Sequence, residues 1–128
     1  MKISIIIPAY NEELALPETL ERIGKTLSIA ACPSEIIVVD NDSQDKTKQV
    51  AEAFGAKVFL EREHNISKVR NTGAENSTGD VLVFIDADTL VPDMLFQKIT
   101  AVMEDEKCFG GAVAVEYGSD DDALACQM

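Results

Sequence analysis

Hydrophobic residues along this chain gather in four short runs that polar segments separate. The runs lie at residues 3–7, 36–39, 58–60 and 81–85. They are rich in β-branched residues, and three of them are almost continuously apolar, which is typical of strands covered on both faces. The pattern therefore predicts a parallel sheet buried between helices.

The segments between these runs have helical spacing. Apolar residues fall on one helix face at 16–27, 47–54 and 95–102, whereas a third helix, at 67–77, is more polar. Typical boundary residues support these helices. The side chains that favour helix starts are Asn11, Ser43, Ser67 and Pro92, and the glycines that favour helix ends are Gly55 and Gly79.

This alternation of strands and helices predicts the fold class. With right-handed crossovers, it gives a Rossmann-like α/β domain, a mostly parallel sheet with helices on both faces. A fifth strand is expected at 109–117. We therefore expect one domain over residues 1–117 and a loosely ordered acidic tail over 118–128.

Composition narrows the class of protein. The 128 residues include 23 acidic and 11 basic side chains, for a net charge of −12, and 46% are hydrophobic. This predicts a soluble domain with a core, and the scattered basic residues argue against a nucleic-acid surface. No apolar run approaches the ~18 residues of a membrane span, and we expect no signal peptide. The three cysteines lack CxxC spacing, which favours reduced thiols and a cytoplasmic location.

Polar residues follow three of the predicted strands. They are residues 8–12 after the first strand, 40–43 after the second and 86–88 after the fourth. Because parallel strands end at one edge of the sheet, where such folds bind ligands, we expect the three clusters to meet.

Asp86 and Asp88 are candidate metal ligands. Two carboxylates separated by one residue in an extended segment point the same way and suit a hard divalent cation, with water and a diphosphate as its other ligands. A solvated acidic turn is the alternative. The strongly hydrophobic strand before them favours the metal site, because unpaired carboxylates beside a core are unfavourable.

The pair Asp40 and Asn41 could read a nucleobase edge or a ribose hydroxyl, since a carboxylate accepts and an amide both donates and accepts. Local side-chain-to-backbone turns are the alternative. Tyr10 could stack on the base, or it could be an ordinary tyrosine at the rim of the core.

The one local basic cluster contains Lys68 and Arg70. If Ser67 caps the helix, both lie in its first turn, where backbone N–H groups favour an anion such as a diphosphate. Solvated surface charges are the alternative. His64, the single histidine, precedes this cap, and we expect no ligand contact from it.

Four ordered blocks of sequence carry a family resemblance. They are residues 6–12 (IIPAYNE), 38–47 (VVDNDSQDKT), 68–73 (KVRNTG) and 79–89 (GDVLVFIDADT). Together they resemble the nucleotide-sugar domain of family-2 glycosyltransferases of the GT-A fold, over residues 3 to about 103. The resemblance implies transfer of a sugar from a nucleoside-diphosphate donor to an acceptor that is a saccharide, a lipid-linked molecule or a protein.

The resemblance also implies roles for individual residues. Asp88, with Asp86, would bind manganese or magnesium, and Arg70 or Lys68 would lie near the phosphates. The cation would neutralise charge on the leaving diphosphate. The residues implied to line the nucleotide-sugar site are Pro8, Ala9, Tyr10, Glu12, Asp40, Asn41, Lys68, Arg70, Asp86 and Ala87.

The chain departs from the family pattern in two ways. Many members carry a second aspartate where Asn41 stands, so the resemblance does not identify uracil as the base. The acceptor half and the general base usually lie well beyond the Asp-x-Asp block, and little sequence follows Asp88. Glu116 or the acidic residues 120–122 could replace that base, but a flexible tail would hold it poorly, so the sequence identifies no catalytic residue.

Two other functions fit part of the pattern. The chain could be a non-catalytic nucleotide-sugar-binding module that forms a homodimer through an exposed sheet edge. A receiver-type signalling domain also places aspartates at strand ends, but it predicts an acidic pair after the first strand and a late lysine, whereas this sequence has Pro8-Ala9-Tyr10 there and no lysine after Lys107. For the transferase, we expect a cytoplasmic protein that could act at the inner membrane face.

Overall fold

Strands and helices alternate along the chain, as the hydrophobic pattern predicts. The structure is a computed structural model, and it describes residues 2–103 and 112–114. In chain order its elements are β1 Ile3–Ala9, α1 Leu16–Ala30, β2 Ser34–Asp40, α2 Thr47–Ala53, β3 Lys57–Leu60, α3 Ile66–Glu75, β4 Val81–Phe84, α4 Leu95–Met103 and β5 Ala112–Ala114.

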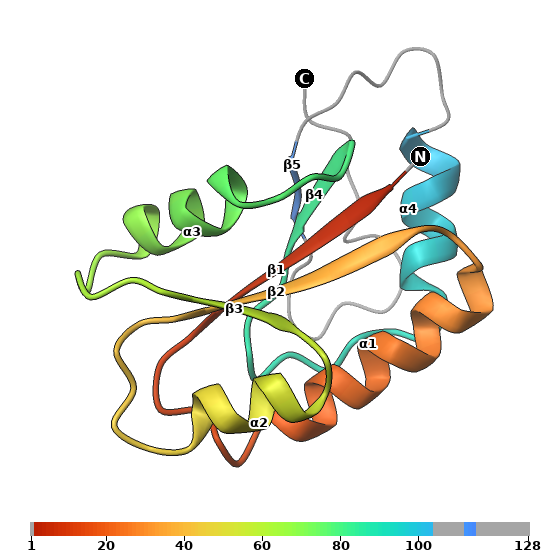
Figure 1. The fold of residues 1–128 in the computed structure, drawn as a ribbon. Coiled ribbons are helices and arrows are strands. Elements are labelled where there is room, and N and C mark those ends of the chain that lie inside the picture. The colour runs from red at the N-terminus through yellow and green to blue at the C-terminus, as the bar shows by residue number, and fades with distance from the viewer. Residues whose placement is uncertain (1, 104–111, 115–128) are drawn as a thin grey trace.

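The five strands form one sheet in the order β3-β2-β1-β4-β5, and every neighbouring pair is parallel (Figure 1). The predicted parallel α/β fold is therefore confirmed. The chain winds outward from β1 to β3, and then crosses back to β4 on the other side of β1. Such a reversal leaves a crevice at the carboxyl ends of the two central strands. Of the predicted fifth strand, residues 112–114 are described as strand, and the rest of 109–117 lies outside the described residues, as does the predicted tail 118–128.

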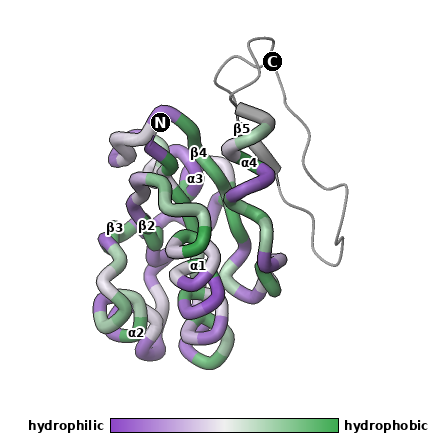
Figure 2. Tube along the Cα trace, turned by 90° about the vertical axis from the view of Figure 1, so that its right-hand side faces the viewer, coloured by the Kyte–Doolittle hydropathy of each residue, from purple (hydrophilic) through white to green (hydrophobic). Residues whose placement is uncertain are grey.

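Helices cover the two faces of the sheet unequally. Helices α1, α2 and α4 lie on one face and α3 on the other (Figure 1). The larger core, between the sheet and these three helices, includes Ile5, Leu20 and Phe96. In Figure 2 the tube is hydrophobic at β4, whereas α1 alternates between hydrophilic and hydrophobic residues. Burial on both faces explains the continuous apolar runs in the sequence.

The smaller core, under α3, depends on a glycine. Val69 of α3 packs there with Ile6, Ile37 and Val39 of the sheet. A Cβ atom on Gly73 would lie 2.4 Å from Cγ2 of Ile6 and 3.1 Å from Cγ2 of Val39. Glycine at this position therefore lets α3 lie close against β1 and β2.

Several predicted helix boundaries are wrong. Helix α1 begins at Leu16 and α2 at Thr47, so Asn11 and Ser43 are not their N-caps. Asn65 caps α3 in place of Ser67, and its side chain accepts hydrogen bonds from the backbone N–H groups of Ser67 and Lys68. The predicted boundary residues Pro92, Gly79 and Gly55 lie outside the helices, at different distances from their ends. Pro92 precedes α4 by three residues, Gly79 follows the end of α3 by four, and Gly55 follows α2 closely with a positive φ of 84°.

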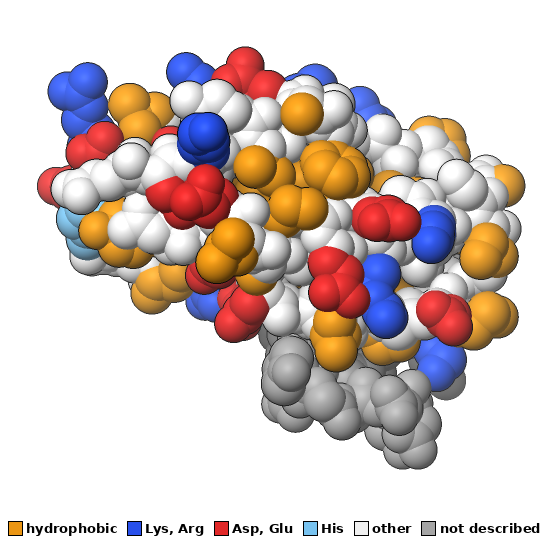
Figure 3. Space-filling view, turned by 90° about the horizontal axis from the view of Figure 1, so that it is seen from below, with side chains coloured by type: hydrophobic (Ala, Val, Ile, Leu, Met, Phe, Trp, Pro, Cys, Tyr) orange, Lys and Arg blue, Asp and Glu red, His pale blue; other side chains and the backbone are white. Residues whose placement is uncertain are grey.

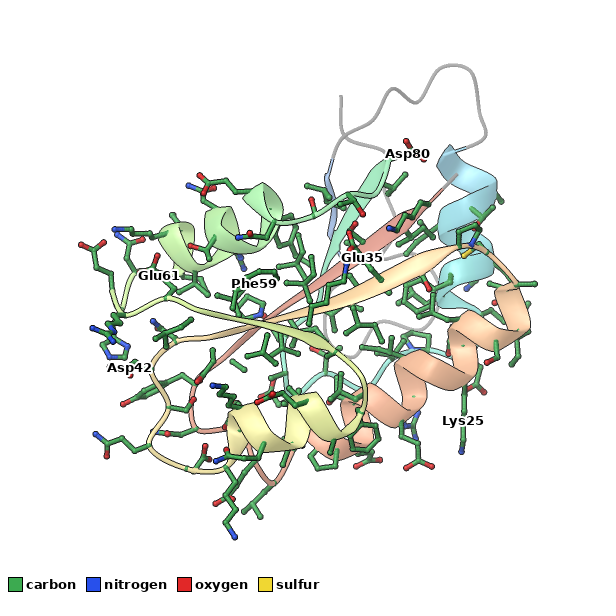
Figure 4. All side chains as sticks on the ribbon, in the orientation of Figure 1. Lys25, Glu35, Asp42, Phe59, Glu61 and Asp80 are labelled. Atoms are coloured by element: carbon green, nitrogen blue, oxygen red, sulfur yellow. The ribbon has the colours of Figure 1, made fainter. Side chains whose placement is uncertain are left out.

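A buried carboxylate ties the amino ends of the strands together. Glu35 of β2, with a side chain only 4% exposed, accepts hydrogen bonds from the Ser4 hydroxyl, the Thr78 backbone N–H and hydroxyl, and the Lys57 ammonium group. Figure 4 shows Glu35 and Asp80 far from Asp42 and Glu61, which lie toward the opposite end of the sheet. This network is therefore structural and remote from the ligand edge.

Candidate functional site

The loops after β1, β2 and β4 meet at the carboxyl edge of the sheet, as the sequence predicts. Ala9 pairs with Asp40 in the register of β1 and β2, and the Asn41 backbone N–H donates to the Ala9 carbonyl. The Ile85 backbone N–H donates to the Ile6 carbonyl, which brings the segment after β4 beside β1. Three clusters far apart in sequence thus share one edge.

The β1–α1 and β2–α2 loops are joined by side-chain hydrogen bonds. The Asn11 N–H donates to Oγ of Ser43 at 2.9 Å, and the Gln44 N–H donates to Oδ1 of Asn11 at 2.8 Å. Asn11 adopts a left-handed conformation, with φ of 52°. The two predicted caps therefore connect loops, because each side chain finds a backbone group of the other loop.

Asp45 and Thr47 complete this connection, a role that the sequence pattern did not predict for either residue. The Glu12 N–H donates to Oγ1 of Thr47 at 2.8 Å, the Thr47 hydroxyl donates to Oδ1 of Asp45, and the Glu13 N–H donates to Oδ2 of Asp45. Burial raises the pKa of Asp45, but these bonds outweigh burial and hold it below its usual value. An Asp-x-Thr sequence at a helix start is the signal that could have found the pair.

Replacing Thr47 with valine tests this connection. Thr47 is fully buried, and valine keeps its shape but leaves the Glu12 N–H and the Asp45 carboxylate without their hydroxyl partner. We expect T47V to lower the free energy of unfolding by about 2 kcal/mol, measured by urea unfolding. The control is Thr100→Val, because among the described residues the Thr100 hydroxyl bonds to nothing but the Phe96 carbonyl of its own helix, α4. Equal, small effects of the two changes would contradict the proposed role of Thr47.

Asp40 and Asn41, which are predicted to contact the base, lie in different environments. Asp40 is 6% exposed, and its Oδ1 accepts the Ser43 N–H at 3.1 Å. Asn41 is committed within the protein: its Nδ2 donates to the carbonyls of Glu61 and Glu63 at 2.6 and 2.8 Å. The Asn41 side chain therefore holds the β3–α3 loop through carbonyls far from it in the sequence, whereas the bond between Asp40 and Ser43 is the local turn of the alternative.

Tyr10 and His64 form an aromatic pair at this edge. Their ring centroids are 4.9 Å apart, with an interplanar angle of 72°. The His64 Nδ1 lies 3.0 Å from Oδ1 of Asn41. Tyr10 is 46% exposed, and Figure 3 shows the histidine at one end of the molecule beside hydrophobic side chains. The half-exposed tyrosine is thus a rim residue with a surface available for stacking.

The Asp86-to-Asp88 segment is a turn and not an extended segment. Strand β4 ends at Phe84, and the Thr89 N–H donates to the Asp86 carbonyl at 3.1 Å. The prediction of extended geometry is therefore wrong. Both aspartates are nevertheless exposed, while Ala87 between them is buried and its carbonyl accepts the Thr19 hydroxyl at 2.7 Å. This anchor to α1 fixes the turn.

Four carboxylates gather here, on Glu12, Asp45, Asp86 and Asp88. Burial raises the pKa of Glu12, and the negative charges of Asp88, Asp45 and Asp86 raise it further. In the described part of the chain, however, no three Asp, Glu, His or Cys side chains converge in metal-binding geometry. The residues therefore fit a cation that takes only one or two ligands from the protein and the others from bound phosphate and water.

The basic cluster lies within α3, with Lys68 in its first turn and Arg70, contrary to the prediction, in the second, and it is partly neutralised. Lys68 lies 2.8 Å from a carboxylate oxygen of Glu63, and this hydrogen bond and the charge of Glu63 raise the pKa of Lys68. Arg70 is exposed and has no ion-pair partner within residues 2–103 and 112–114. Of Lys68 and Arg70, Arg70 is therefore the one whose positive charge is available to an anion. The predicted substitutes for a general base, Glu116 and 120–122, lie outside the described residues.

Comparison with known proteins identifies the family. The family model described as "Glycosyl transferase family 2" matches residues 4–125. The chain is 36% identical, over 77% of its length, to a dolichol-phosphate mannosyltransferase of Pyrococcus furiosus. It is 33% identical, over 95% of its length, to an undecaprenyl-phosphate 4-deoxy-4-formamido-L-arabinose transferase of Pseudomonas fluorescens. The chain spans 29% and 37% of these two relatives.

Solved structures of glycosyltransferases share the fold. The structure of mannosyl-3-phosphoglycerate synthase from Rubrobacter xylanophilus matches with a TM-score of 0.74 and 27% identity, over 83% of this chain and 38% of that one. S. aureus TarS 1–349 in complex with UDP matches with a TM-score of 0.69 and 27% identity, over 84% of this chain and 33% of that one. No helix in the described ranges is long and apolar enough to cross a membrane. By the family model and these relatives, the chain belongs to glycosyl transferase family 2.

Proposed function

We propose that this chain binds a nucleoside-diphosphate sugar through a divalent cation and donates the sugar to an acceptor. The observation that carries the proposal is the group of carboxylates on Glu12, Asp45, Asp86 and Asp88, which lies at the same sheet edge as Tyr10. Burial is the main cause of the raised pKa of Glu12, and a cation bound there would relieve the further contribution of repulsion between the carboxylates. It would also offset the charge of a diphosphate. TarS and a glucosyl-3-phosphoglycerate synthase have been solved with UDP, which supports a nucleotide donor.

All the predicted site residues except Asn41 and Lys68 have a place in this proposal. Asp88 and Asp86 hold manganese or magnesium, which supplies Lewis-acid stabilisation of the leaving diphosphate. Tyr10 stacks on the base, Asp40 accepts a hydrogen bond from the nucleoside, and Arg70 lies near the phosphates. Pro8, Ala9 and Glu12 belong to the strand end and loop that shape the pocket, and Ala87 fixes the turn that carries the aspartates.

We also propose a chemical class for the molecule that accepts the sugar. The two relatives compared above are named for dolichol phosphate and undecaprenyl phosphate. These names support a lipid-linked acceptor, and we place the reaction at the inner face of a membrane as part of the same proposal. A binding module without transfer is the alternative, and release of sugar from the donor in the presence of acceptor distinguishes the two.

Donor binding is tested by thermal unfolding with UDP and UDP-sugars, with and without manganese. Ligand at 100 times its dissociation constant adds about 2.7 kcal/mol of stability, which raises Tm by several degrees in a domain of this size. We expect Asp88→Ala to remove the manganese-dependent part of the shift. The control is Asp93→Ala, an exposed carboxylate beside Arg22 and Lys25. No shift with any nucleotide, or equal shifts in the two variants, would contradict the proposal.

A further inference from the structure

The Asn41 amide determines which ring nitrogen of His64 carries a proton. Both carbonyls near Asn41, those of Glu61 and Glu63, can only accept, so the Asn41 atom facing them is the donor Nδ2. Oδ1 of Asn41 therefore faces Nδ1 of His64 at 3.0 Å, and Nδ1 must donate. A neutral His64 is then the Nδ1–H tautomer, and its Nε2 is an acceptor.

The Nε2 atom of His64 is free to bind a ligand. In residues 2–103 and 112–114, the one hydrogen bond of the His64 ring is that to Asn41 and its one ring contact is that with Tyr10, and no group bonds to Nε2. The ring is exposed and lies against the half-exposed Tyr10, at the sheet edge that also holds Asp40. An oriented, unused acceptor thus lies beside the aromatic surface on which a base would stack.

We propose that His64 is a specificity-determining residue that accepts, through Nε2, a hydrogen bond from the nucleoside part of the donor. This inference rests on the proposed function. It assigns the hydrogen bond to the nucleoside to His64 and not to Asn41, because the Asn41 amide bonds to carbonyls within the protein. The hydrogen comes from a ring N–H of the base stacked on Tyr10. A ribose hydroxyl offers the same chemistry, and the experiment separates the two sources.

Two substitutions of His64 separate its two nitrogen atoms. In His64→Asn the side-chain amide replaces Nδ1 and keeps the donor to Asn41, but it removes the acceptor at Nε2. In His64→Gln an amide oxygen can take the position of Nε2. We expect the Kd for UDP with manganese to rise about tenfold in H64N and less than about threefold in H64Q, measured by calorimetry.

Modified nucleotides identify the hydrogen that Nε2 accepts. With 3-methyl-UDP, which lacks the ring N–H, we expect the wild type and H64N to bind equally, whereas with 2′-deoxy-UDP the tenfold difference should persist. If the difference between the wild type and H64N instead persists with 3-methyl-UDP and disappears with 2′-deoxy-UDP, His64 contacts the nucleoside through the ribose hydroxyl. A tenfold difference that survives both modifications, or equal binding of UDP by the wild type and H64N, overturns the inference. Absence of binding of any nucleoside diphosphate by the wild type contradicts donor binding itself, and with it this inference.

The single histidine also permits a direct measurement. Its imidazole nitrogen signals are unambiguous in long-range ¹H–¹⁵N spectra, because the chain has one histidine. At alkaline pH we expect the Nδ1–H tautomer in the free protein, and a shift of the Nε2 signal when UDP and manganese are added. An Nε2–H tautomer in the free protein, or an unchanged Nε2 signal in the complex, would refute the assignment.

Discussion

Glu35→Ala should lower the free energy of unfolding by about 3 kcal/mol at neutral pH. The carboxylate is 4% exposed and accepts hydrogen bonds from the hydroxyl groups of Ser4 and Thr78, the Thr78 N–H and the Lys57 ammonium group. Its removal leaves the fully buried Ser4 hydroxyl without its acceptor, and an unpaired buried group is unfavourable by about 1–3 kcal/mol. Lys57 is 56% exposed and returns to water, which limits the loss.

Glu63→Ala is the matched control for this change. Glu63 also pairs with a lysine, Lys68, at 2.8 Å, but its side chain is 64% exposed. Exposed ion pairs contribute less than about 1 kcal/mol, so we expect a much smaller effect of E63A in urea unfolding. If E35A and E63A lower the free energy of unfolding by similar amounts, the buried network around Glu35 stabilises the protein no more than an exposed ion pair does.

The same network predicts how stability depends on pH. Burial raises the pKa of Glu35, but the hydrogen bonds from Ser4, Thr78 and Lys57 outweigh burial and lower it to about 2 from its usual 4.5. Since the folded value is the lower one, the contribution of the charged form is complete above pH 4.5 and is lost as the pH falls toward 2. The stability difference between the wild type and E35A should therefore shrink by about 2–3 kcal/mol between pH 6 and pH 2. A difference that does not change with pH would contradict the lowered pKa.

Gly79→Ala should lower the free energy of unfolding by about 3 kcal/mol. A Cβ atom on Gly79 would lie 2.4 Å from Oγ of Ser4, 2.7 Å from its backbone nitrogen and 3.0 Å from the Lys2 carbonyl. Two of these atoms belong to backbone at the start of a central strand, which cannot move without disturbing the sheet, so the added carbon would cause strain. The Gly79 N–H also donates to Oγ of Ser4 at 2.8 Å, and that bond would be disturbed.

Gly24→Ala is the control for this substitution. Gly24 lies within α1, and a Cβ atom there would meet nothing within 4 Å. Because alanine favours a helix over glycine by about 1 kcal/mol, we expect G24A to raise the free energy of unfolding. Thermal or urea unfolding of the two variants should thus give changes of opposite sign, and a stabilising G79A would disprove the close approach.

The sequence predicts the strands better than the ends of the helices. Continuous apolar runs locate β1, β2 and β4 to within a few residues, because strands buried on both faces have few polar positions. Asn11 and Ser43 are typical caps, yet their side chains bond to each other's loops over more than 30 residues of sequence. Local propensity contains no information about such partners.

In the candidate site, too, the sequence predicts some features and not others. That Tyr10, Asp40 and Asp86 share one sheet edge follows from parallel strand order, and the sequence predicts it. The turn after β4 and the internal use of the Asn41 amide were not predictable, since both depend on carbonyl groups and neighbours that the chain supplies only when folded.

The pattern of apolar and polar residues by itself determined the α/β class, the parallel sheet and the sheet edge that carries the polar clusters. Burial imposes these features on the order of residues, because each strand and helix face must be apolar where it meets the core. The tertiary structure alone decided which polar atoms remain free. Hydrogen bonds between distant loops satisfy Asn41 and Asp45 and leave Arg70 and Nε2 of His64 without a partner among the described residues, and such pairing depends on three-dimensional proximity.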